Sequence, residues 1–154
     1  MLVPKPVTVM FCAGCFLFLG CGHRLERNFF FGNPPQTRIE RFRQYTLEDQ
    51  YRLFRYGNDK IEPPVMSFDE IIAERGASVV PFLLRQLNCK SDDIAVRDAM
   101  LVFRAMAVSK SYDVKDDSAV MTTLAARVSG MKHKDWQSFC QGMLRQIESA
   151  EKGP

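Results

Sequence analysis

The sequence predicts an all-α fold of stacked antiparallel helical hairpins, and three observations support this prediction. Apolar residues recur three or four positions apart between Tyr45 and Ser149, which is the spacing of one helix face. No window in this range shows sustained alternation of apolar and polar residues, so no strands are expected. The polar segments between the periodic stretches are short, which favours antiparallel neighbours.

Polar caps and glycines divide the first part of this range into two predicted helices. Thr46 is a typical cap for the first helix, and Gly57 is expected to end it. Ser67 and Glu70 have the spacing of a capping box, so a second, short helix is expected to begin there and to end at Gly76.

Four further helices are predicted in the second part. The third begins at Ser78 and has Pro81 in its first turn, where a proline costs no internal hydrogen bond. Ser91 or Asp92 caps the fourth and longer helix, and Gly130 ends the fifth. The sixth carries an apolar stripe that consists of Trp136, Phe139, Cys140, Met143, Leu144 and Ile147.

The beginning of the chain has the pattern of an export signal. Lys5 precedes an uncharged, largely apolar run over residues 7–19. A basic start and an apolar centre of about 7–15 residues are typical of secretory signals. The run is too short for a membrane-spanning helix, which needs about 20 apolar residues. We therefore expect residues 1–20 to direct export and to be removed.

The end of this signal resembles the lipobox of bacterial lipoproteins in the residues Phe18-Leu19-Gly20-Cys21. The resemblance implies that Cys21 is acylated on its sulfur and becomes the new N-terminus. It also implies that the protein is anchored to the cell envelope and faces the periplasm. Gly22 follows where an aspartate would signal retention in the inner membrane, so the resemblance favours the outer membrane.

An ordinary signal peptidase offers an alternative cleavage. Gly20-Cys21-Gly22 is a small-x-small triplet that such an enzyme would cut before His23. In that case the mature protein would carry no lipid and would diffuse freely.

Three segments are predicted from this organisation: a signal peptide at 1–20, a lipid-anchored tether at 21–45 and a helical domain at 46–154. Removing the signal leaves 134 of the 154 residues, which suits one domain. The tether is expected because residues 22–45 lack a sustained apolar period and contain Pro34-Pro35. Phe29-Phe30-Phe31 is expected either to pack onto the domain or to enter the membrane interface. The arginines around it would either contact anionic head groups or be solvated charges of a linker.

The charge of the chain limits its possible binding partners, and its cysteine content limits its possible disulfides. The mature chain would have 20 basic and 18 acidic side chains, which argues against a nucleic-acid partner. Cys89 and Cys140 remain after the signal and Cys21 are set aside. In an oxidising compartment they would form a disulfide that stabilises the fold by roughly 4 kcal/mol. The alternative is two buried free thiols.

One segment, residues 76–87, resembles the first helix of a HEAT-type repeat. It combines a small residue, an early proline (Pro81) and a Leu-Leu-x-x-Leu run. The helix over 94–107 would complete that hairpin. The resemblance implies a helical scaffold that binds other proteins. Because a solenoid needs at least three repeats for a continuous core, a compact bundle is the alternative architecture.

The sequence predicts no catalytic residues, no cofactor and no metal site. The mature chain has two histidines, His23 and His133, and a zinc site or a nucleophile–base pair usually needs more. The doublets Asp92-Asp93 and Asp116-Asp117 each precede a predicted helix, where aspartates cap free amides. A set of methionines is assigned to core packing: Met100, Met106, Met121, Met131 and Met143.

The sequence therefore favours a non-enzymatic envelope lipoprotein that acts as a protein-binding adaptor or scaffold. The alternative is an immunity or inhibitor protein that blocks a particular toxin or hydrolase in the periplasm. An envelope enzyme centred on His133 is the least favoured hypothesis. The aromatic candidates for a binding face are Tyr45, Tyr51, Phe54, Tyr56 and Tyr112, with Tyr51 and Phe54 expected to be partly in the core.

Overall fold

The computed structural model describes residues 24–32, 34–61, 67–88 and 92–150. In these residues all regular structure is helical and no strand is present, which confirms the all-α prediction. The α-helices are α1 (Arg24–Phe31), α2 (Arg38–Arg43), α3 (Leu47–Lys60), α4 (Phe68–Ala73), α5 (Val80–Asn88), α6 (Asp93–Ser109), α7 (Ser118–Ser129) and α8 (Lys134–Ser149). Three 3-10 turns lie at Pro35–Thr37, Gly76–Val79 and Val114–Asp116.

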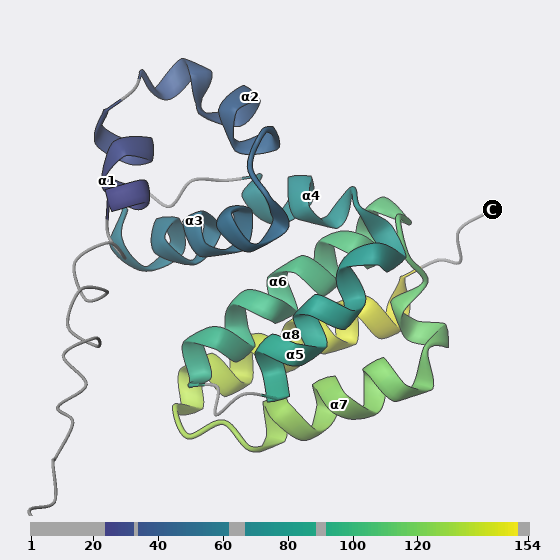
Figure 1. The fold of residues 1–154 in the computed structure, drawn as a ribbon. Helices are drawn as coiled ribbons and strands as arrows, with labels where there is room; N and C mark the ends of the chain where they lie inside the picture. Colours follow the sequence, from purple (N-terminus) through teal and green to yellow (C-terminus); the bar gives the residue numbers. More distant parts are fainter. Residues whose placement is uncertain (1–23, 33, 62–66, 89–91, 151–154) are drawn as a thin grey trace, which may run out of the picture.

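The last four α-helices form two hairpins that stack side by side (Figure 1). The α5–α6 hairpin packs against the α7–α8 hairpin, so that α5 contacts α7 and α6 contacts α8. The two helices α6 and α8 run parallel. At their starts the Asp93 carboxylate accepts hydrogen bonds from the amides of Lys132 and His133, and further along Arg104 Nε donates to Gln146. This is a repeat-like arrangement of hairpins.

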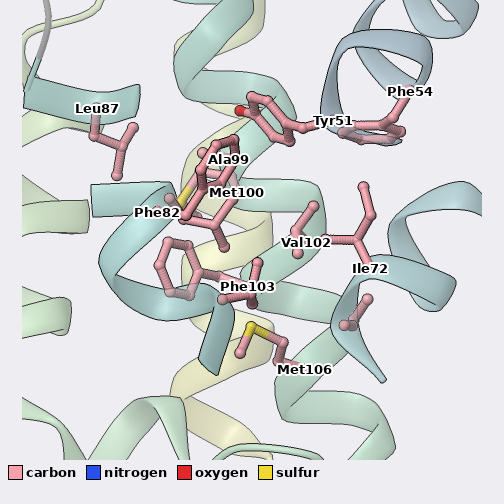
Figure 2. Packing of buried hydrophobic residues seen from close by; sticks show 14 of the residues in the cluster. Tyr51, Phe54, Ile72, Phe82, Leu87, Ala99, Met100, Val102, Phe103 and Met106 are labelled. Carbon is pink, nitrogen blue, oxygen red and sulfur yellow. The ribbon is translucent and has the colours of Figure 1, made fainter. Parts of the chain in front are cut away.

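Helix α6 lies at the centre of the core, between α4 and α8. Most of its residues are buried, and Figure 2 shows several of its side chains with those of α3 and α5 around them. The labelled residues are Tyr51, Phe54, Ile72, Phe82, Leu87, Ala99, Met100, Val102, Phe103 and Met106. The contacts join elements from both halves of the chain into a single hydrophobic core.

Side-chain caps at three helix starts are confirmed. Thr46 Oγ1 accepts a hydrogen bond from the amide of Asp49 at 3.2 Å. Asp92 Oδ1 accepts from the amide of Ala95 at 2.8 Å, and Asp117 Oδ1 caps α7 in the same way. These bonds satisfy amides that have no partner within the helix.

The capping box predicted at Ser67 is wrong. Ser67 has a left-handed backbone with φ 82°, and its side chain makes no capping hydrogen bond. The helix that follows ends at Ala73, and Gly76 begins a 3-10 turn with φ 59°.

Gly57 does not end the first predicted helix, because α3 continues to Lys60. A Cβ atom at Gly57 would lie 3.1 Å from Cζ of Phe30 on α1. The glycine therefore allows a close approach between two helices. The prediction that Gly57 ends the helix is therefore wrong, and the glycine serves the packing of the two helices.

The prediction of a tether over 21–45 is wrong for the described residues from Arg24 onward. Helix α1 packs on α3, and α2 packs on α4. Phe29, Phe30 and Phe42 are buried. The Phe42 ring stacks on Phe68 with centroids 4.0 Å apart, and the Phe30 ring stacks on that of Tyr56 at 5.5 Å. The folded domain therefore includes α1 and α2.

Candidate functional site

A groove of about 350 Å³ lies between α6 and α8 on the surface of the stacked hairpins. This volume is within the range of pockets that bind ligands. The groove is lined by Leu101, Arg104, Ser138, Phe139, Gly142, Met143 and Gln146.

Helical spacing explains why these residues meet. On α8, positions 138, 139, 142 and 146 share one side of the helix, next to the side that carries the buried Cys140 and Ile147. On α6, Leu101 and Arg104 are three residues apart and face the same way. Arg104 Nε donates a 2.5 Å hydrogen bond to Gln146 Oε1 across the two helices. The groove therefore has an apolar floor and a polar edge.

Phe139 is the apolar side chain in this groove that is most open to solvent. It is 48% exposed, whereas Met143 beside it is buried. Its ring makes an edge-on contact with Trp136 at 6.2 Å, which holds the aromatic pair at one end of the groove. An exposed aromatic ring on a rigid helix is typical of an anchor residue in protein interfaces.

Gly142 lies in the interior of α8, where a glycine costs roughly 0.5–1 kcal/mol relative to alanine. A Cβ atom added at Gly142 would meet no atom within 4 Å. Packing inside the protein therefore does not explain this glycine. Its effect is to leave the backbone of α8 accessible to a side chain from outside.

We expect Gly142→Ala to raise the free energy of unfolding by about 0.5–1 kcal/mol, because the new methyl group reduces backbone freedom in the unfolded chain without a clash. Urea denaturation followed by circular dichroism measures this change. Gly57→Ala is the matched control in another helix, and it should gain less because its methyl group would press on Phe30. Equal gains at both positions would contradict this explanation.

A second feature is the buried charge network between α3 and α6. The Asp98 side chain is 0% exposed, and Arg97 Nη2 donates to its Oδ1 at 2.6 Å. Arg55 on α3 lies 3.4 Å from the Asp98 carboxylate, and Asn58 donates to it at 3.3 Å. Burial raises the pKa of the Asp98 carboxyl, and the two arginines and the amide partly offset this effect.

The surface beside this network carries charges that pair with one another. Arg52 Nε lies 2.7 Å from the carboxylate of Glu26, and Lys60 Nζ lies 2.8 Å from Asp59. Arg55 also approaches Asp92 at 3.7 Å. Because the cations here have carboxylate partners, this face has no excess of one sign with which to bind a charged ligand. We assign the network to structure.

The reactive residues predicted from the sequence are either structural or outside the described ranges. Cys21, His23 and Cys89 lie outside the described residues. Cys140 is buried with a free thiol, and burial raises its pKa to about 11. His133 Nδ1 accepts a long 3.5 Å hydrogen bond from the amide of Trp136, so it caps α8. Within the described ranges no cluster of three metal-binding side chains is present.

The predicted aromatic face is largely internal. Tyr51 and Phe54 are buried, and Tyr45, Tyr56 and Tyr112 pack against the core with only part of each ring exposed. The helical spacing of the sequence places Phe139 in the core stripe, so its exposure was not predicted. Its position one residue before Cys140, at the edge of that stripe, was the available signal. The assignment of methionines to core packing is confirmed for Met100, Met106, Met131 and Met143.

Comparison of the chain with protein-family models, with characterised proteins and with solved structures finds no match. Among the described helices, none has the length and the apolar character required to cross a membrane. The groove between α6 and α8 and the predicted export signal are therefore the features that bear on function.

Proposed function

We propose that this protein is a lipid-anchored, non-catalytic component of the bacterial cell envelope that binds a protein partner in the groove between α6 and α8. The observation that carries this proposal is that the groove contains both the exposed Phe139 and, at Gly142, helix backbone that no side chain covers.

The chemistry of the groove suits a protein ligand. Protein interfaces combine an apolar, aromatic centre with a polar rim, and Arg is enriched in them. Phe139, Leu101 and Met143 would supply the centre, and Arg104 and Gln146 would supply the rim. Stacked helical hairpins also provide the extended surfaces that repeat proteins use for binding.

The roles of the titratable groups favour binding over catalysis. His133, Asp92 and Asp117 cap helices, and Asp98 is held in a buried ion-pair network. None of these groups faces the groove with a second reactive side chain in hydrogen-bond reach, as acid–base or nucleophilic catalysis requires.

The lipid anchor is tested by Cys21→Ser. For the wild type we expect a mature species that begins at Cys21, carries the mass of acyl chains and sediments with membranes. The variant should lose the acyl mass and leave the membrane fraction. Intact mass spectrometry and membrane fractionation measure both effects. A wild-type protein without acyl mass that begins at His23 would contradict the anchor.

The partner is tested by a photo-reactive amino acid at position 139 in cells that express the full chain. We expect one defined cross-linked adduct in the envelope, and Gly142→Leu should abolish it by filling the groove while leaving the fold intact. The matched control places the probe at Ala125, an exposed position on α7. Equal adducts at both positions, or no effect of Gly142→Leu, would contradict the proposal. A stoichiometric toxin or hydrolase as the partner would favour the immunity hypothesis over the adaptor.

A further inference from the structure

Helix α1 has an outward face that is basic and aromatic. Its inner side buries Glu26, Phe29 and Phe30 against α3 and α4. At helical spacing the opposite side carries Arg24, Arg27 and Phe31, which are all exposed.

The exposure of Phe31 is unusual for its side chain. It is 71% exposed, whereas its neighbour Phe30 is 1% exposed. In the described part of the chain, neither Arg24 nor Arg27 forms an ion pair, in contrast to Arg52 of α3, which pairs with Glu26 of α1. This face therefore has two cations and one large apolar side chain that the fold itself does not use.

The position of α1 in the chain indicates what covers this face. Only Gly22 and His23 separate Cys21 from the first residue of the helix. An extended chain spans at most about 3.6 Å per residue, so Arg24 lies within roughly 11 Å of Cys21. If Cys21 is acylated, α1 must therefore begin close to the membrane surface. A flexible tether of more than twenty residues, as expected from the sequence, would have imposed no such limit.

We propose that the outward face of α1 rests on an anionic phospholipid bilayer, with Phe31 in the interfacial region and with Arg24 and Arg27 at the head groups. This inference rests on the lipid anchor of the proposed function. Arg and Phe are the residue types that place a helix in a membrane interface. Each basic side chain near an anionic surface strengthens such binding about fivefold.

This orientation agrees with the proposed binding groove. Helix α1 contacts α3, α3 contacts α6, and α8 packs on α6 (Figure 1). The groove is lined by residues of α6 and α8. Helix α3 therefore lies between α1 and the two helices that line the groove. The short connection would hold the groove at a set height above the membrane and leave it open to a partner.

The test uses the full chain, acylated in cells, purified and reconstituted into vesicles of phosphatidylcholine with or without phosphatidylglycerol. Phe31→Trp supplies a fluorescent reporter on the proposed contact. Val108→Trp is the matched control, since Val108 is an exposed apolar residue (64%) at the end of α6. The native Trp136 gives the same background in both variants. Lipids brominated on their acyl chains quench an indole that enters the interface.

We expect bromolipid to quench the added fluorescence of Phe31→Trp and to shift its emission to shorter wavelength, with neither effect for Val108→Trp. Arg24→Gln combined with Arg27→Gln should lower the equilibrium constant for contact between α1 and the surface of anionic vesicles by about 30-fold. All of these substitutions are at exposed positions, so the core is unaffected.

Two outcomes would overturn the inference, and the experiment distinguishes them. Protein that stays on the vesicles with no quenching of Phe31→Trp would retain the anchor but leave the α1 face for another occupant, such as an acidic protein. Protein that does not stay on the vesicles would overturn the anchor, and this inference with it.

Discussion

Phe30→Ala is expected to lower the free energy of unfolding by about 3–5 kcal/mol, whereas Phe31→Ala next to it should change it by less than about 0.5 kcal/mol. The two substitutions remove the same side chain from adjacent positions of α1. Phe30 is buried, stacks on Tyr56 and fills the space beside Gly57, so its removal leaves a cavity. Phe31 is exposed and leaves none.

The measurement is urea denaturation of the purified protein, followed by circular dichroism. Domains of this size have total stabilities of about 5–15 kcal/mol, so the loss at Phe30 would shift the transition strongly. Effects near zero at both positions would show that residues 24–45 act as a tether after all. Similar losses at both positions would contradict the orientation of α1.

Asp98→Asn is expected to destabilise the protein by about 3–5 kcal/mol, because it leaves the buried Arg97 guanidinium without its carboxylate. Asn58 donates a hydrogen bond to Asp98 in the native protein. Arg97 also donates to the Oδ1 atom that accepts this bond, whereas Arg55 donates to Oδ2, so an asparagine at position 98 would turn an NH2 donor toward one set of these donors. Thermal or urea unfolding of the purified variant measures the loss.

A double variant separates the effect of the unpaired charge on stability from the effect of altered packing. Arg97→Leu in the Asp98→Asn background removes the unpaired charge, so part of the stability should return. Glu74→Gln is the surface control, since the Arg43–Glu74 pair is exposed and its loss should change stability little. A double variant that is less stable than Asp98→Asn would contradict the explanation, because the stacking of Arg97 on Trp136 would then be the dominant contact.

The caps of α3, α6 and α7 could be predicted because they depend on local chemistry. A Thr or Asp oxygen reaches an amide only two or three residues away, so the sequence contains both partners. The long helix α6 was predicted for a related reason, since its many apolar residues keep one spacing over several turns.

The position of α1 and α2 could not be predicted in this way. Each helix has at most eight residues, too few for a clear apolar period, and Pro34-Pro35 between them is typical of a linker. Their stability comes from aromatic contacts with α3 and α4, such as the stacking of Phe42 on Phe68. Tertiary packing of this kind stabilises short helices that are marginal alone.

The sequence by itself determined the helical class and the main helices, because each depends on residues that are neighbours in the chain. The export signal is a prediction of the same local kind. Only the tertiary structure decided which of three consecutive phenylalanines are buried, why position 57 is a glycine, that Gly142 faces open space, and that Phe139 is exposed. Those properties depend on which atoms of distant segments fill the space around a side chain. At Gly57 that space is filled by Phe30, and at Gly142 it is empty.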